Sequence, residues 1–149
     1  MLSQKAFYFG GILLSQLKSK FLVEAGFLED VKGLKVFIRK IQNSIEGVEL
    51  NGSRVQRLCN NINLRFRSVN GRSLARKLNE KNIYVSAGSA CLSGGVSPSH
   101  VLLAMGVPEK LARASVRFSL GRYTTDDEVV YVLRELPAII RRMRASSVC

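Results

Sequence analysis

The sequence predicts an α+β fold in which helices cover one face of a small three-stranded sheet. Two patterns support this class. Apolar and polar residues alternate in three segments, as in half-buried strands, and apolar residues recur every three or four positions in several others, as in amphipathic helices. With 149 residues, of which 46% are hydrophobic, the chain can build one domain with its own core. We assign this domain to residues 31–149 and leave residues 1–30 as an N-terminal segment of uncertain role.

The first predicted helix and the first predicted strand lie early in the domain. Residues 31–45 place apolar side chains on one helical stripe, and Gly47 ends the helix. Residues 60–67 alternate strictly, so that one face of a strand is apolar and the other polar. The apolar face consists of Ile62, Leu64 and Phe66.

A short helix and a second strand are predicted next. The pair Asn70-Gly71 is typical of a turn, and Ser73 is the predicted N-cap of the helix that follows. Apolar and polar residues alternate again over residues 83–87, which predicts the second strand.

Two short helices and a third strand complete the predicted sheet. Ser97 and Pro98 provide an N-cap and a first helical residue, and Pro108 opens the next short helix. Residues 115–120 alternate, with the apolar side chains on the core side. Arg117 therefore points away from the core.

A long helix closes the chain. Thr125 and Glu128 have the spacing of a capping box, and apolar residues then recur at helical intervals as far as Met143. Pro137 lies within this pattern and is expected to kink or split the helix, because proline has no N–H to donate.

Residues 86–99 have the composition of a flexible loop and carry one cysteine, Cys91. The segment is rich in Gly and Ser and lacks periodic apolar residues. A cysteine used for packing normally has apolar neighbours, so this setting favours an accessible, reactive thiol.

The segments SAGSACLSGGVSPSHVLLAMGV and ARASVRFSLGRYTTDDEV resemble, in order and in spacing, the C-terminal domain of NifS-type cysteine desulfurases. These are class V aminotransferases of the fold-type I pyridoxal-phosphate enzymes. The similarity extends from about Leu34 through RLCNNINLRF to LPAIIRRMRA. It implies the small C-terminal domain of that fold, in agreement with the α+β class predicted from the patterns.

The resemblance also implies functions for two residues. Members of the family release sulfur from L-cysteine, form alanine and hold the sulfur as a persulfide on the cysteine of the GSAC motif, which here is Cys91. The arginine of RFSLGR, here Arg117, resembles the residue that binds the substrate carboxylate, a role that suits a planar guanidinium. Cys59 precedes a strand and Cys149 ends the chain, so we expect both to be bystanders and Cys59 to react slowly.

The resemblance implies pyridoxal phosphate as cofactor, although the residues that bind it in the family are largely absent from this sequence. In the family the cofactor lysine lies in a larger N-terminal domain. Ser3-Gln4-Lys5 faintly echoes the lysine segment, but Gln4 stands where histidine is expected, and Lys5 is a remote candidate. We therefore expect the chain alone to be inactive, as a truncated form of the enzyme.

Bulk properties exclude several other classes. The net charge is +12, but the basic residues are spread along the chain and are not interleaved with aromatic residues that could stack on bases. Both features disfavour nucleic-acid binding. The three cysteines without CxxC spacing and the single His100 predict neither disulfides nor a metal site. No segment is apolar enough to span a membrane. The cysteine usage favours a reducing compartment, the cytoplasm, with the mitochondrial matrix as the alternative.

Other functions and partners stay open at this point. The main alternative is a non-catalytic sulfur carrier, or a module that docks a scaffold protein; a basic nucleic-acid-binding protein is a weaker one. The resemblance implies an iron-sulfur scaffold or another sulfur-acceptor protein as partner, and a homodimer for the full-length family. We also expect the uncovered face of the sheet to be apolar, because a second domain covers it in the family.

Overall fold

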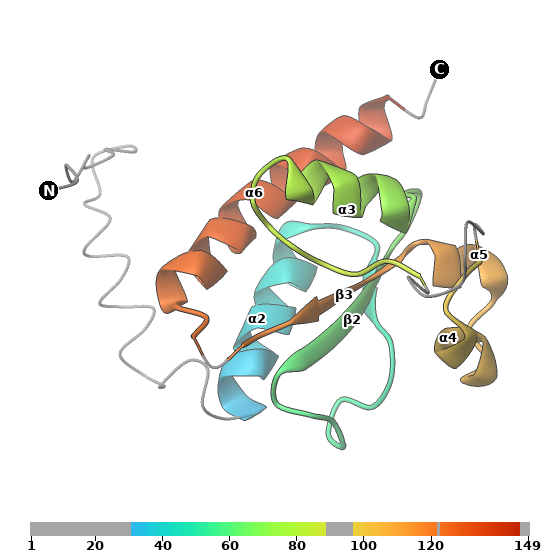
Figure 1. The fold of residues 1–149 in the computed structure, drawn as a ribbon, viewed down its shortest axis with the longest axis horizontal. Helices are drawn as coiled ribbons and strands as arrows, with labels where there is room; N and C mark the ends of the chain where they lie inside the picture. Colours follow the sequence, from blue (N-terminus) through green and yellow to red (C-terminus); the bar gives the residue numbers. More distant parts are fainter. Residues whose placement is uncertain (1–30, 89–96, 122, 147–149) are drawn as a thin grey trace, which may run out of the picture.

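The computed structural model describes residues 31–88, 97–121 and 123–146. In chain order the elements are α2 (Val31–Ser44), β1 (Val48–Leu50), β2 (Asn61–Phe66), α3 (Gly71–Asn79), α4 (His100–Ala104), α5 (Glu109–Arg113), β3 (Ser115–Ser119) and α6 (Asp126–Ala145). The strands form one antiparallel sheet in the order β1-β2-β3. Figure 1 shows α2, α3 and α6 side by side around these strands. The predicted α+β class is confirmed.

A single hydrophobic core lies between the sheet and the three longer helices. The alternation in β2 buries one set of side chains completely, and β3 adds two more from the neighbouring strand. The helices contribute buried side chains from α2, α3 and α6, so these helices pack on the same face of the sheet. The largest fully buried side chains are Phe37, Phe66, Leu34, Ile41, Ile62, Leu64, Leu74, Leu78, Leu136, Ile140 and Val116.

The sheet has three strands, as predicted, but one of them is not the predicted one. Two predicted strands are confirmed as β2 and β3, whereas residues 83–87 contribute only an isolated bridge between Ser86 and Arg117. The third strand is β1, which the sequence analysis missed because three residues are too few to show a period of two. Gly47 makes β1 possible: its φ of +67° turns the chain out of α2 and into the sheet.

Two helix caps differ from the predicted ones. The N-cap of α3 is Asn70, whose side-chain oxygen accepts a hydrogen bond from the Ser73 N–H at 3.0 Å. The N-cap of α4 is Ser99, two residues after the predicted Ser97, and α4 itself begins at His100. In both cases several residues near the start of the helix have side chains that can act as N-caps. The backbone conformation places only one of them where it can accept the hydrogen bond.

The predicted capping box at the start of α6 is confirmed. The Thr125 hydroxyl accepts from the Glu128 N–H at 3.3 Å, and the Glu128 carboxylate accepts from the Thr125 N–H at 2.8 Å. Pro137 lies inside α6 but does not split it, since the helix is continuous from Asp126 to Ala145. Burial of Leu136, Ile139 and Ile140 against the core holds the helix together around the proline.

Gly71 is a point of close approach between α3 and the start of β3. A Cβ atom at this position would lie 2.6 Å from the carbonyl oxygen of Ser115 and 2.9 Å from that of Arg113. Both distances are shorter than a carbon and an oxygen tolerate, and both partners are backbone atoms. Only glycine therefore lets α3 begin against this part of the chain.

We expect Gly71→Ala to lower the free energy of unfolding by about 1–3 kcal/mol, because the added methyl group must displace backbone. Urea unfolding followed by circular dichroism measures this value. Gly121→Ala is the matched control: its Cβ would meet no atom closer than 3.8 Å, so the change should stay below about 1 kcal/mol. Equal stabilities for Gly71→Ala and the parent chain would contradict the close approach.

Candidate functional site

The face of the sheet that points away from α2, α3 and α6 is polar. It carries the alternate side chains of the three strands, and α5 covers its end near Ser115. The expectation of an apolar uncovered face is therefore wrong: the central strand β2 and the edge strand β3 both place polar residues on it. The large exposed apolar side chains lie instead on loops and on α4, namely Val55, Leu58, Tyr84, Val101, Leu103, Met105 and Tyr123.

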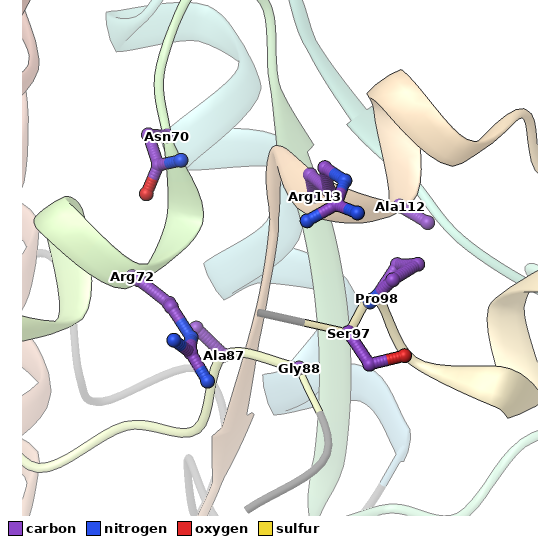
Figure 2. A pocket seen from close by; sticks show the side chains of 8 residues that line it. All are labelled: Asn70, Arg72, Ala87, Gly88, Ser97, Pro98, Ala112 and Arg113. Atoms are coloured by element: carbon purple, nitrogen blue, oxygen red, sulfur yellow. The ribbon is translucent and has the colours of Figure 1, made fainter. Parts of the chain in front are cut away.

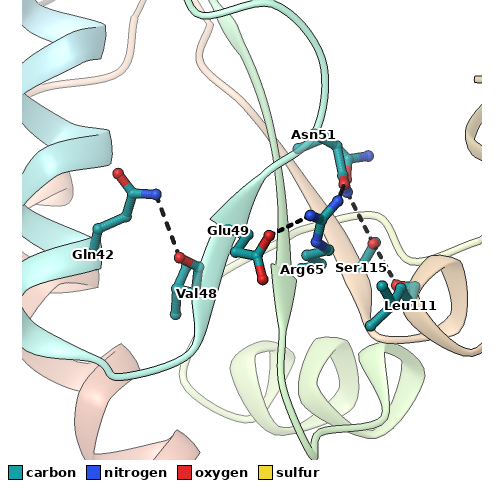
Figure 3. Close-up of polar contacts among 8 residues, drawn as sticks. Gln42, Val48, Glu49, Asn51, Arg65, Leu111 and Ser115 are labelled. Atoms are coloured by element: carbon teal, nitrogen blue, oxygen red, sulfur yellow. Dashed lines mark hydrogen bonds and ion pairs between the residues drawn. The ribbon is translucent and has the colours of Figure 1, made fainter. Parts of the chain in front are cut away.

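Asn51 organises the polar side chains on this face. It follows β1, is only 5% exposed, and donates through Nδ2 to Asn63 Oδ1 at 2.9 Å and to Ser115 Oγ at 3.0 Å. Its Oδ1 accepts from Arg65 at 2.9 Å, and Arg65 also pairs with Glu49 (Figure 3). Sequence reasoning missed Asn51. Asn51-Gly52 has only the signature of a turn, and its burial depends on strands distant in sequence.

Two arginines project from this face, and only one of them is engaged. Arg65 lies opposite Ser115 and Arg117 lies opposite Asn63 in the β2–β3 register. The guanidinium of Arg65 is held by Glu49 and Asn51. The Arg117 side chain is exposed, as predicted, and makes no hydrogen bond or ion pair with other described residues. Arg117 is thus available for an anionic ligand.

The outer edge of β3 is paired with the segment that leads to Cys91. Ser86 and Arg117 exchange two backbone hydrogen bonds: the Arg117 N–H donates to Ser86 O at 2.7 Å, and the Ser86 N–H donates to Arg117 O at 3.0 Å. Cys91 itself lies outside the described residues, within the gap from 89 to 96. The structure thus brings Arg117 to the strand edge from which the Cys91 loop departs.

The two ends of that gap meet in a narrow neck. Gly88 has a φ of +76°, and a Cβ atom there would lie 3.2 Å from the carbonyl oxygen of Ser97. Figure 2 shows a small hollow at the neck, with Arg72 and Arg113 among its lining residues. Its free volume of about 20 Å³ suits about one water molecule. The hollow is therefore too small for an amino-acid substrate.

The described residues do not fit pyridoxal phosphate. The cofactor needs a lysine for its covalent attachment, and no lysine lies on the strands or on the polar face. The described lysines lie on α2, α3, α5 and the turn after α3. Among the described residues there is also no cluster of His, Cys, Asp and Glu able to hold a metal ion, and none of their helices could cross a membrane.

The environment of Cys59 corrects one expectation. We expected this thiol to be protected by the strand that follows it, but Cys59 lies in the turn before β2 and is exposed. Cys59 lies two residues before Asn61, the first paired residue of β2, so the sheet does not shield the thiol. Cys91 and Cys149 both lie outside the described residues.

Comparison with known proteins identifies relatives over most of the chain. Residues 28–132 match the model of the aminotransferase class-V family. The chain is 47% identical over 111 residues to cysteine desulfurase IscS of Dictyoglomus turgidum, covering 74% of this chain and 28% of the relative. It is 41% identical over 124 residues to cysteine desulfurase 2 of Trichormus variabilis, and this match covers 80% of this chain and 31% of the relative.

The fold has similar counterparts among solved structures. A NifS-like protein superimposes with a TM-score of 0.61 at 27% identity, covering 85% of this chain and 31% of that one. The chain therefore spans less than a third of the length of these relatives. The similarity to a NifS-like structure confirms the fold that the sequence motifs implied.

The contrast between the two arginines predicts different reactivities. We expect phenylglyoxal to modify Arg117 well before Arg65, because the Arg65 guanidinium is held by Glu49 and Asn51. Peptide mass spectrometry over a time course measures both rates in one sample. Glu49→Gln is the matched variant, and it should raise the rate at Arg65 alone. Modification of Arg65 before Arg117 in the parent chain would contradict this assignment.

Proposed function

Because the chain belongs to the aminotransferase class-V family, we propose that it is the cysteine-bearing small domain of a cysteine desulfurase. In this proposal Cys91 holds the sulfur as a persulfide and Arg117 binds the carboxylate of L-cysteine. The observation that carries the proposal is the pairing of Ser86 with Arg117. This pairing joins the segment that leads to Cys91 to the strand that carries Arg117. The relatives named cysteine desulfurase support the same reading.

The setting of Arg117 suits the binding of a carboxylate. A guanidinium presents two parallel N–H donors that match the two oxygens of the anion. Arg117 projects from the middle of β3 onto a face that no long helix covers, and its neighbour Arg65 is neutralised by Glu49. Among the described residues, therefore, no ion pair has to break before the Arg117 guanidinium engages a substrate.

The chain connection limits how far Cys91 can be from this arginine. Ser86 precedes Cys91 by five residues, which span at most about 18 Å when fully extended. Gly88 and Ser97, the two ends of the neck, restrict the departure point of the loop further. A thiol on such a tether can reach a substrate at Arg117 and can also reach outward to an acceptor.

When the sulfur comes from a persulfide on another protein, its transfer to Cys91 needs no oxidant or reductant. The Cys91 thiolate attacks the outer sulfur of a persulfide donor, forms a new S–S bond and displaces the donor's inner sulfur as a thiolate. The same exchange in the opposite sense passes the outer sulfur to an acceptor thiol. One sulfur atom moves in each step, and the number of S–S bonds is unchanged.

Release of sulfur from L-cysteine requires pyridoxal phosphate as electron sink, and the described residues do not fit that cofactor. This observation favours a second candidate function, a sulfur carrier that receives a persulfide from another enzyme. An iron-sulfur scaffold or another sulfur-acceptor protein is the proposed partner in both cases. We also propose that the whole enzyme is a homodimer. Its proposed location is the cytoplasm, with the mitochondrial matrix as the alternative.

We expect Cys91 to be the main site of persulfide formation. The chain is incubated with an intact cysteine desulfurase and L-cysteine, and the bound sulfane sulfur is measured by cyanolysis and located by peptide mass spectrometry. In a Cys149→Ser background, Cys91→Ser should abolish most of the transfer, because a thiol in a Gly- and Ser-rich segment is expected to approach the donor. Cys59→Ser should leave the transfer unchanged, and it is a matched control because it removes an exposed thiol that lies in a turn. Transfer that survives Cys91→Ser would overturn the assignment.

Protection by substrate tests the proposed role of Arg117. L-cysteine should slow the modification of Arg117 by phenylglyoxal, whereas Arg141, an exposed arginine on α6, should react at the same rate with and without it. Equal protection of the two arginines would mean that L-cysteine consumes the reagent and does not occupy Arg117.

We expect the chain alone to bind no pyridoxal phosphate and to form no alanine from L-cysteine, because no described lysine lies on the face with Arg117. Absorbance of a lysine-bound cofactor and quantification of alanine after cofactor addition measure the two properties. If cofactor does bind, Lys5→Ala tests the one remote candidate. Alanine formation that is lost in Lys5→Ala would contradict the sulfur-carrier function and support a complete desulfurase.

A further inference from the structure

A second binding surface lies between α2 and β1, on the edge of the sheet opposite to the Cys91 neck. It is an open groove with a free volume of about 290 Å³. Helix α2 supplies one wall, and β1 with the loop after it supplies the other. The lining residues are Lys35, Ile38, Arg39, Gln42, Leu50, Arg54 and Val55. We refer to this surface as the basic groove.

Local hydrogen bonds fix the shape of the loop wall. The Ser53 hydroxyl accepts from the Val55 and Gln56 N–H groups at 3.1 and 2.9 Å. Arg57 then ties the loop to β2 by donating to the carbonyls of Ser53 and Asn61 at 3.1 and 2.9 Å. Burial lowers the pKa of Arg57. These contacts hold the loop, and with it Arg54 and Val55, against the edge of the sheet.

The charge of the groove has one sign. Lys35 and Arg39 lie one helical turn apart on α2, and Arg54 faces them from the loop; none of the described residues that line the groove is acidic. All three cations are exposed, and none makes a hydrogen bond or ion pair with another described residue. Such a cluster attracts a partner of opposite charge.

The floor of the groove is apolar. The Ile38 side chain is 6% exposed and Leu50 is half-buried beside it, whereas Val55 is 75% exposed at the rim. An apolar floor beneath a charged rim is typical of surfaces that receive an apolar anchor flanked by charges. A free phosphate or carboxylate would use the rim and leave the floor uncovered.

We propose that the basic groove binds an acidic peptide segment of a protein partner, with Leu or Ile side chains seated on Ile38, Leu50 and Val55 and with Asp or Glu side chains paired with the cations. Single-stranded nucleic acid fits less well. Its binding sites stack bases on aromatic side chains, and no aromatic residue is found among the described residues that line the groove. The proposal does not depend on Cys91, because the groove and the neck lie on opposite edges of the sheet.

The test uses the full chain and a fluorescent synthetic helix that carries Leu at every third or fourth position and Glu or Asp elsewhere. We expect binding by fluorescence anisotropy, weakened about tenfold or more in the variant Lys35→Glu/Arg39→Glu/Arg54→Glu. The matched control is Lys110→Glu/Arg141→Glu/Arg142→Glu, which removes the same charge from exposed positions of α5 and α6. This control should bind almost as well as the parent chain.

Two further probes separate the apolar contribution to binding from the contribution of the charges. Val55→Ser, and a helix with Ser in place of Leu, should each weaken binding, because the apolar contact is lost while the charges remain. Circular dichroism confirms that each variant is folded. The proposal is overturned if the helix does not bind at millimolar concentration, if both triple variants weaken it equally, or if a single-stranded oligonucleotide of equal charge binds more tightly at the same salt.

Discussion

The antiparallel pairing of β2 with β3 is the interaction on which the rest of the structure depends. Its register sets Ile62 against Phe118 and Leu64 against Val116 on the helix side of the sheet. The same register sets Asn63 against Arg117 on the other side. Because side chains alternate across a strand, a slip by one residue would bury Arg117 and expose the core residues. The stability of the core and the position of the candidate site therefore have the same origin.

Neighbouring side chains give two arginines on the polar face different surroundings. Arg65 and Arg117 come from adjacent strands, but Glu49 and Asn51 of the β1 side hold only Arg65. The short strand β1 thus engages one arginine and leaves the other open. It also provides Leu50 to the floor of the basic groove, so a strand of three residues contributes to both of the proposed surfaces.

The two edges of the sheet lead to different surfaces. Beyond β3, the bridge at Ser86 and the neck between Gly88 and Ser97 fix the base of the Cys91 loop. Beyond β1, the loop held by Ser53 and Arg57 forms the basic groove with α2. A partner in that groove would leave the Cys91 edge open.

The sequence alone determined the features that depend on local pattern. The helix of α2, the strands β2 and β3, the capping box of α6 and the outward direction of Arg117 all follow from residue periodicity or short-range hydrogen bonding. The motif around Cys91 pointed to the family before any contact was known. The proposed roles of Cys91 and Arg117 remain predictions of that resemblance.

Only the tertiary structure decided the features that depend on residues distant in sequence. Asn51 is buried because β2, β3 and α5 meet around it, and no local pattern reports that meeting. The uncovered sheet face is polar and not apolar for a related reason: periodicity tells which residues share a face, but not which groups they meet there. The pairing of Ser86 with Arg117 is made by backbone groups, which are the same in nearly every residue. Which residues pair in this way therefore depends on the packing of the whole chain and is not visible in the sequence.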